Sequence, residues 1–378
     1  MVFFYPLIFP QECAKIKIIE VKNMRKLRRY KRKTRKKIII LSSLTLLLFL
    51  CAGYAAFNTK LNITAKGNII CTPIPVNDLK NNITVSEDGL HKDIYREDTY
   101  VYAGAKPDNY IYFNNELWRI ISIMGSNLKI IKADPLATPM NFDYSTNRLD
   151  GHYCSSTNSQ GNNGCNLWGS VNETEMNGSS YATNFPYRTD NYSYTLQGPN
   201  DVSYINNYLN NEYYNSIDES SKKYIEQYYY DYGLLPTMVN SSSYNINDLL
   251  NQSRYIFGKY LVSLPKATDY IIASTYTGCG EHHYYSSETC TKAAAQQNWM
   301  YDSNHNLWTI NPTEYLYNSQ YYTQKVAVIS KETGGIIQSN AFQSTPNNYV
   351  KPTVILNSNI KLCGKGSEKN PYYIYEGN

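Results

Sequence analysis

The stretch Gly258–Ser274, GKYLVSLPKATDYIIAS, is the part of the sequence that decides the predicted fold. The residues up to Leu264 have the pattern of a strand, and Pro265 suits the first positions of a helix. That helix would carry Asp269 and Tyr270. The segment therefore predicts a strand, a turn and a short helix in succession.

Strands are predicted on both sides of this segment. Residues 99–132 alternate in polarity, with turn residues at Asn114-Asn115 and Gly125, and therefore predict successive antiparallel strands. Trp118 and Arg119 lie within one of them, where we expect a structural role. Further strands are expected at Lys325–Ser330 and Tyr349–Leu356, and after the glycine-rich turn at 364–366 an edge strand.

Two helices complete the predicted fold class. Residues 201–217 place Ile205, Leu209 and Tyr213 on one helical face, and residues 218–233 run from an N-cap residue to a glycine stop. Short antiparallel strands combined with two helices define an α+β fold.

The N-terminal part indicates a membrane protein. Residues 22–37 are rich in Lys and Arg and precede an uncharged stretch at 38–57, which is long enough for a transmembrane helix. Basic residues on its N-terminal side place residues 1–37 in the cytoplasm and the remainder outside. A cleaved signal, which would release a secreted protein, is the alternative to a retained anchor. Met24 is an alternative start to Met1.

The exported part divides into two segments. Residues 58–94 are expected to hold a strand and a linker, and residues 95–378 an ectodomain with a loop insertion at about 134–200. Beyond residue 37 acidic residues outnumber basic ones, which argues against a nucleic acid as partner.

Six cysteines lie in the exported part, and an even number favours disulfides. Equal spacing pairs Cys154 with Cys165 and Cys279 with Cys290, which leaves Cys71 and Cys363 to pair with each other. Domain termini often lie close together, which supports this last pair. A zinc site near Cys279, His282 and His283 is the rival, but no CxxC pair is present and no metal is expected.

Several segments resemble known families. SLPKATDYIIAS resembles the helix start of the formylglycine-generating-enzyme family, and VKPTVIL at 350–356 resembles its closing strand. NELWRIISI, NWMYDSNHNLWTINP and GKGSEKNPYYI resemble a group of uncharacterised anchored surface proteins of Gram-positive gut bacteria. The resemblance covers about residues 24–70 and 95–378, and it implies a C-type-lectin-like domain.

The resemblance does not extend to the family's cofactor sites. Members of the formylglycine-generating-enzyme family are oxidases that hold copper with paired cysteines near the C-terminus. This chain has only Cys363 there. Calcium-binding lectins use E-P-N and W-N-D motifs, which Asn311-Pro312 and Asn298–Asp302 match only in outline. Neither nucleotide nor metalloprotease motifs occur. We therefore expect no cofactor and no catalytic residues.

The loop between two tryptophans is the candidate binding site. Large amphipathic rings dominate many binding sites, so an aromatic platform could hold sugar rings or a peptide. The alternative is that the tryptophans fix long loops in the core. The candidate ligand-binding residues are Trp299, Tyr301, His305, Trp308 and Asn311.

These features predict a membrane-anchored, extracellular protein that binds a carbohydrate or protein ligand, in adhesion or a similar role. One alternative is a surface enzyme, related to formylglycine-generating oxidases or acting on cell-wall or protein substrates. Another is a hypervariable lectin-like receptor that is diversified at Asn and Tyr positions, because the chain holds 39 tyrosines.

Overall fold

The computed structural model describes residues 71–84, 88–143, 166, 168–169, 202–233, 235, 246–253, 257–278, 288–317 and 320–376. Strands take up 38% of the structure and helices 20%, so the protein is mostly β-sheet. The predicted α+β class, a C-type-lectin-like domain of short antiparallel strands and two helices, is therefore wrong. Much of the chain expected to be helix or linker pairs into sheets instead.

Three consecutive strands form the centre of the main sheet. β4 (Tyr110–Phe113), β5 (Glu116–Met124) and β6 (Asn127–Lys132) pair antiparallel in chain order. Asn114 and Asn115 connect the first two with φ angles of 52° and 59°, a left-handed pair that suits a tight hairpin turn. Gly125, at φ 59°, turns the chain between the second and third. The predicted strands and turns of this region are confirmed.

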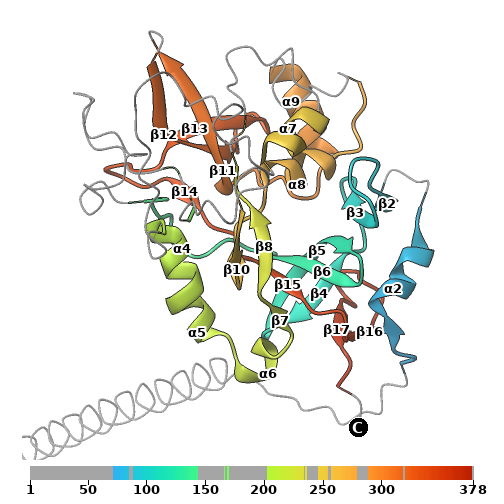
Figure 1. Cartoon of the computed structure of the whole chain (residues 1–378). Coiled ribbons are helices and arrows are strands. Elements are labelled where there is room, and N and C mark those ends of the chain that lie inside the picture. Colours follow the sequence, from blue (N-terminus) through green and yellow to red (C-terminus); the bar gives the residue numbers. More distant parts are fainter. Residues whose placement is uncertain are drawn as a thin grey trace, which may run out of the picture. The chain divides into compact units, whose positions relative to one another are not determined.

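Strands from distant parts of the chain extend this centre on both sides (Figure 1). Within the described residues the main sheet has eleven strands, in the order β1-β16-β17-β4-β5-β6-β15-β10, with β3 also on β5, β2 on β3 and β7 on β15. The added strands are β1 (Ile74–Pro75), β2 (Gly89–Lys92), β3 (Thr99–Ala103), β7 (Ile225–Glu226), β10 (Val262–Ser263), β15 (Thr353–Leu356), β16 (Lys361–Cys363) and β17 (Tyr372–Ile374).

β17 differs from its prediction as an edge strand. It pairs antiparallel with β16 on one side and parallel with β4 on the other, so both of its edges are occupied. The pairing with β4 joins residues that are far apart in sequence, for example Tyr373 with Tyr112. A local pattern cannot reveal such a partner.

Two smaller sheets accompany the main one. A four-stranded sheet has the order β13-β12-β11-β14, and a two-stranded sheet pairs β8 with β9. Their bounds are β8 (Tyr228–Asp231), β9 (Phe257–Tyr260), β11 (Asn306–Tyr317), β12 (Gln320–Ile329), β13 (Ile336–Asn340) and β14 (Asn348–Tyr349).

The first predicted helix is present and the second is mostly strand. α4 (Tyr204–Tyr208), η3 (Leu209–Tyr213) and α5 (Tyr214–Ser216) follow one another, and the Ser203 hydroxyl caps their start. α6 (Glu219–Lys222) lasts only one turn before the chain enters β7 and β8. The helix predicted over 218–233 is wrong, because its tyrosine-rich end pairs with other strands.

The other helical segments are α2 (Val76–Leu79), η1 (Lys80–Asn82), α7 (Ile246–Ser253), α8 (Ala267–Ile272) and α9 (Glu288–Gln296).

The Gly258–Ser274 stretch folds as strand, turn and helix. β9 and β10 precede Pro265, and α8 begins two residues later. The Asp269 carboxylate accepts a hydrogen bond of 2.9 Å from the backbone N–H of Lys266, which satisfies a donor at the start of α8. The predicted local structure is confirmed.

The two faces of the central strands bury different cores. The inner face carries Trp118 and Ile120 into a core shared with α4 and β15. The outer face carries Ile121 and Ile131 into a second core, which α8 and β12 help to form. We use inner face and outer face in this sense below. Arg119, between Trp118 and Ile120 on β5, belongs to the outer face.

A disulfide joins the beginning of the described chain to its end. Cys71 pairs with Cys363 at a Cα–Cα distance of 5.8 Å, and β1 pairs with β16 directly beside it. This is the pair that elimination among the cysteines indicates. The segment at 58–94, expected to hold a strand and a linker, contributes β1, α2 and β2. Cys290 is also disulfide-bonded, whereas its predicted partner Cys279, like Cys154 and Cys165, lies outside the described residues.

The predicted transmembrane helix at 38–57 lies outside the described residues. Among the residues that the structure does describe, no helix is long and apolar enough to cross a membrane. The structure therefore gives the predicted membrane helix no support. The predicted tail at 1–37, the strand at 61–70 and most of the loop insertion also fall outside these ranges.

Candidate functional site

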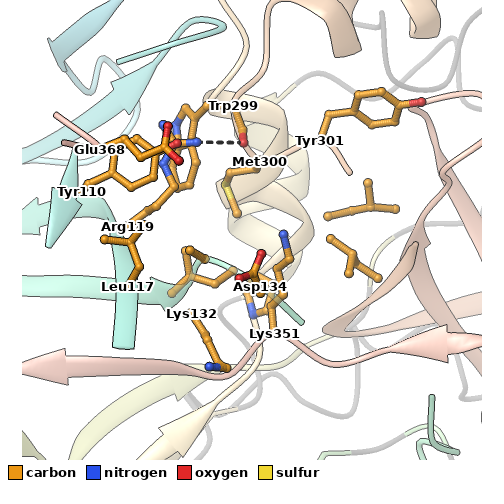
Figure 2. Close-up of a pocket in the computed structure, with 15 residues that line it drawn as sticks. Tyr110, Leu117, Arg119, Lys132, Asp134, Trp299, Met300, Tyr301, Lys351 and Glu368 are labelled. Atoms are coloured by element: carbon orange, nitrogen blue, oxygen red, sulfur yellow. Dashed lines mark hydrogen bonds between the residues drawn. The ribbon is translucent and has the colours of Figure 1, made fainter. Parts of the chain in front are cut away.

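A cavity of about 280 Å³ lies on the outer face of the main sheet (Figure 2). Its floor comes from β4, β5 and β6, and one wall comes from the segment that follows α9. The lining combines aromatic rings with charged groups of both signs. It consists of Tyr110, Leu117, Arg119, Ile131, Lys132, Ala133, Asp134, Pro265, Trp299, Met300, Tyr301, Leu307, Ile329, Lys351 and Glu368.

Arg119 lies between two aromatic rings at one side of this cavity. Its guanidinium carbon is 4.3 Å from the ring centre of Tyr110 and 4.4 Å from that of Trp299. Guanidinium groups stack favourably on aromatic faces, and each such contact contributes about 0.5–2 kcal/mol, more as water is excluded. The two rings therefore hold the guanidinium plane in one orientation.

Hydrogen bonds fix the same side chain. Nε donates to Asn109 Oδ1 at 2.8 Å, and the terminal nitrogens donate to the carbonyls of Pro107 at 3.3 Å and Trp299 at 3.4 Å. A guanidinium has five N–H donors, so two remain for another acceptor. No ion pair joins Arg119 to a carboxylate within the described part of the chain, although Glu368 lines the same cavity.

The charge of Arg119 persists at neutral pH. Burial lowers the pKa of its guanidinium to about 10, while Tyr110 and Glu368 act in the opposite direction. A group with this pKa is protonated at pH 7. The cavity therefore contains a fixed, fully charged cation with donors to spare.

The other two cations of the cavity each have a carboxylate partner. Lys132 contacts Glu116 at 2.5 Å, and Lys351 contacts Asp302 at 3.4 Å. Burial lowers the pKa of Lys351, although Asp302 opposes this shift. Figure 2 shows Asp134 and Lys351 together, whereas the side chain of Lys132 points away from them, as its pairing with Trp118 of the inner face requires. Arg119 is the cation of this cavity that lacks an ion pair among the described residues.

Two of the five predicted ligand-binding residues line the cavity. Trp299 stacks on Arg119 and donates from its indole nitrogen to the Tyr102 carbonyl at 2.6 Å. Tyr301 donates to the Lys331 carbonyl at 2.6 Å, with its ring at the opposite end from Arg119 in Figure 2. His305 does not line the cavity but contacts Asp302, the partner of Lys351, at 3.1 Å.

The other two predicted residues lie in the core. Trp308 is 0% exposed and donates to the Met140 carbonyl, and its ring contacts Phe142. Asn311 is also fully buried, where it accepts from Ala267 N–H and donates to the Gly233 carbonyl. Both side chains hold loops in place, which is the alternative that the sequence leaves open for this region. The predicted row of rings therefore does not form one platform.

A second charged cluster on the outer face is buried, and its charges are paired with one another. Lys129 Nζ lies 2.5 Å from Asp269 Oδ2, and the side chains of both residues are almost completely buried. Arg96 adds a weaker contact of 3.6 Å to the same carboxylate. Burial alone would raise the pKa of Asp269, but Lys129, Arg96 and Lys266 together lower it to about 2. This cluster joins α8 to β6 through a buried ion pair.

The arrangement around the cavity suits binding of an anion. A preorganised guanidinium with free donors recognises carboxylates and phosphates through paired hydrogen bonds. Within the described ranges no group of three or more His, Cys, Asp or Glu side chains is placed to hold a metal ion. Among the cavity's titratable groups, Lys132 and Lys351 are held in ion pairs and Tyr301 in a hydrogen bond.

The most informative residue of the cavity was not among the predicted site residues. Arg119 stands in a strand that is otherwise mostly apolar, NELWRIISI, and was expected to be structural. Its charge in such a strand is the signal that could have drawn attention to it. Tyr110 lies opposite Arg119 in the predicted hairpin, whereas Trp299 completes the site from 180 residues away, which no local pattern shows.

Comparison with known proteins adds no further evidence on the family or the fold: no family model, no curated protein and no solved structure matches the chain. The site is therefore interpreted from its own chemistry.

Proposed function

We propose that this chain is an extracellular ligand-binding protein whose pocket around Arg119 receives the carboxylate of a small polar molecule. The observation that carries the proposal is the Arg119 guanidinium itself. It is held between two rings, faces a cavity, and has no ion pair within the described residues. A protein that keeps such a cation preorganised lowers the entropic cost of binding an anion.

The charges around the cavity support a ligand with one acidic group. Lys132 and Lys351 already contact Glu116 and Asp302, so Arg119 is left as the attachment point. The additional carboxylates of Asp134 and Glu368 suit hydroxyl groups of a ligand, because ionised carboxylates accept hydrogen bonds. A molecule that combines one carboxylate with several hydroxyls matches this pattern, as an acidic sugar does.

The volume of the cavity supports a small ligand. Typical sites for drug-sized molecules measure about 300–1,000 Å³, and this cavity of about 280 Å³ falls just below that range. One sugar unit or a small hydroxy acid is of a suitable size.

The disulfide supports the extracellular part of the proposal. Cys71 and Cys363 are joined across a sequence separation of 292 residues. Structural disulfides persist in oxidising compartments and are rare in the cytosol. An exported, disulfide-closed domain with a polar pocket is consistent with ligand binding outside the cell.

Calorimetric titration of the full chain tests the proposal. The probes are glucuronate, galacturonate and N-acetylneuraminate, with glucose as the uncharged counterpart of glucuronate. We expect at least one acid to bind and glucose to bind at least about tenfold more weakly, because a charge-assisted hydrogen bond contributes about 1.5–3 kcal/mol. Arg119→Gln should abolish binding, and Arg119→Lys should retain part of it.

Lys132→Gln is the matched control, because Lys132 lines the same cavity but already has a carboxylate partner. This variant should change the affinity much less than Arg119→Gln does. Near-UV circular dichroism checks that each variant is folded. Equal binding of glucose and glucuronate, or a folded Arg119→Gln variant with unchanged affinity, would contradict the proposal.

A further inference from the structure

Tyrosines continue along the outer face from the cavity. On β4, Tyr110 pairs with Arg119, and two residues further Tyr112 pairs with Leu117, which also lines the cavity. Tyr112 pairs in turn with Tyr373 on β17. Paired residues on neighbouring strands point to the same face, and so do residues two apart on one strand. Tyr375 follows β17 directly, and its N–H still donates to the Lys361 carbonyl of β16, so the alternation continues to it. Tyr110, Tyr112, Tyr373 and Tyr375 therefore form one row, which we call the tyrosine strip.

The strip is exposed where its neighbours on the inner face are buried. Tyr112 is 48% exposed and Tyr375 is 42% exposed, while the inner-face residues Ile111 on β4 and Tyr372 on β17 are 0% and 6% exposed. The strip is therefore not part of either core. It begins at the cavity, because Tyr110 and Leu117 belong to the cavity's lining, and it leads away along β4 and β17 (Figure 1).

The direction of the strands gives the strip its length. β4 and β17 run parallel, with Tyr373 beside Tyr112, so Tyr110 lies two residues before this pair and Tyr375 two residues after it. Four steps along parallel strands span about 13 Å at about 3.3 Å each. The strip is thus longer than the single unit that the cavity can hold.

We propose that the cavity and the tyrosine strip together bind an acidic oligosaccharide, with its charged sugar at Arg119 and further sugar units on Tyr112, Tyr373 and Tyr375. This inference rests on the proposed function of the cavity and extends it to a substrate class. Tyrosine offers an apolar ring face for the C–H face of a sugar, and a hydroxyl for its polar edge. Arg119 supplies the charge complementarity for the acidic unit.

The structure favours a sugar chain over a peptide. Peptides that bind to sheets commonly add a strand to a free edge. β4 lies between β17 and β5, and β17 lies between β16 and β4, so both strands have their main-chain edges occupied. Recognition on this face must therefore use side chains, and rings spaced along a flat face suit successive sugar rings.

The structure also favours a sugar chain over a folded protein partner. A stable protein interface buries about 800 Å² on each partner, with an apolar centre. The strip is one row of tyrosines, two of which are only about half exposed. A row this narrow suits a linear chain.

Chain-length titration of the full protein tests the inference. The probes are oligogalacturonides of one to four units, hyaluronan oligosaccharides of matched length, and methyl-esterified oligogalacturonides, which keep the shape without the charge. We expect affinity to rise by about tenfold or more between one and three units in at least one acidic series, and the esters to bind much more weakly, because each ring on an aromatic platform adds contact area.

Tyr112→Ala and Tyr375→Ala should remove the gain with chain length and leave binding of the single unit unchanged. Tyr229→Ala is the matched control, since Tyr229 is 50% exposed but lies on β8 in a separate sheet. This control should bind every probe as the unchanged protein does. A tetraglutamate peptide is included as an acidic chain without sugar rings, and it should show no tyrosine-dependent binding.

The possible failures are distinguishable. If a single acidic sugar binds through Arg119 but neither series gains with length, or the strip variants match the Tyr229→Ala control, the tyrosine strip is not a binding site and the proposed function stands. If longer chains bind through the tyrosines while esterification and Arg119→Gln change nothing, the proposed function of the cavity is overturned, and with it the acidic ligand. Tyrosine-dependent binding of tetraglutamate would assign the strip to a peptide and overturn the inference.

Discussion

Two cations on neighbouring strands of one sheet face meet opposite environments. Lys129 on β6 lies 2.5 Å from Asp269, and its side chain is only 3% exposed. Arg119 on β5 faces a cavity, and its contacts are two aromatic rings and neutral oxygens. The chain places a carboxylate in direct contact with the first cation, whereas Glu368 lies near the second without forming an ion pair with it in the described part of the chain.

This difference separates a structural charge from a binding charge. Burying an ion pair costs desolvation energy, which direct contact between the two charges must offset, so Lys129 and Asp269 serve to join α8 to the sheet. A fixed cation without a partner contributes little to joining elements, but it provides a site for an external anion.

The largest effect on stability is expected from removing the buried ion pair between Lys129 and Asp269. Asp269→Ala leaves Lys129 buried without its partner and removes the hydrogen bond to the start of α8. The free energy of unfolding should fall by about 3–5 kcal/mol. Urea denaturation of the full chain measures it. A double variant, Lys129→Met with Asp269→Leu, should recover more than half of the loss, and a single variant that loses less than 1 kcal/mol would contradict a structural role for the pair.

The next largest effect is a dependence of stability on pH, caused by the titration of Asp269. The pKa of Asp269 is lowered from 3.8 in the unfolded chain to about 2 in the folded protein, so the unfolded state binds the proton first as pH falls. Its stabilising contribution is therefore complete above about pH 5 and is lost progressively toward about pH 1, in total about 2 kcal/mol. Denaturation curves between pH 5 and pH 2 should show a steeper loss for the unchanged protein than for Asp269→Ala. Parallel curves for the two proteins would contradict this origin.

Arg119→Gln should cost less stability than Asp269→Ala. The variant loses two ring contacts and three hydrogen bonds but leaves no buried carboxylate unpaired. A loss of about 1–2 kcal/mol is expected, because cation–π contacts of partly exposed groups contribute about 0.5–1 kcal/mol each. The same urea titration measures it. A loss as large as that of Asp269→Ala would show that Arg119 is a structural charge as well.

The smallest effect concerns the ion pair at the edge of the cavity. Glu116 is 43% exposed, so its contact with Lys132 should contribute less than about 1 kcal/mol to stability. Glu116→Gln should therefore leave the unfolding curve nearly unchanged. Lys132 pairs with Trp118 of the inner face, so freeing its ammonium should change the affinity for an acidic sugar by less than about twofold. An affinity that rises fivefold or more would show that Lys132 does face the ligand.

Local patterns identified several elements of the fold. The hairpins of β4, β5 and β6 follow from alternation and from turn residues such as Asn114 and Asn115. The strand, turn and helix around Pro265 follow from residues within a few positions of one another. The Cys71–Cys363 pair could be inferred because counting and spacing removed the other cysteines.

Distant pairing explains where those patterns failed. Residues 225–231 were predicted as the end of a helix, but they form β7 and β8 because β15 and β9 are available as partners. Trp308 was a candidate for the binding site, but β11 pairs with β12 and carries it into the core against Phe142. Side-chain burial depends on what the strand packs against, and the strand itself does not encode it.

The sequence by itself determined the hairpins, the short helix after Pro265, and the supply of tyrosines and charged residues, because these depend on neighbours along the chain. Only the tertiary structure decided which of those residues meet. It placed Trp299 on Arg119 across 180 positions and Asp269 on Lys129 across 140. The reason is physical. Whether a buried cation forms an ion pair or remains available to a ligand depends on the groups that the folded chain brings within a few ångströms of it. Those groups come from strands and helices that are remote in sequence.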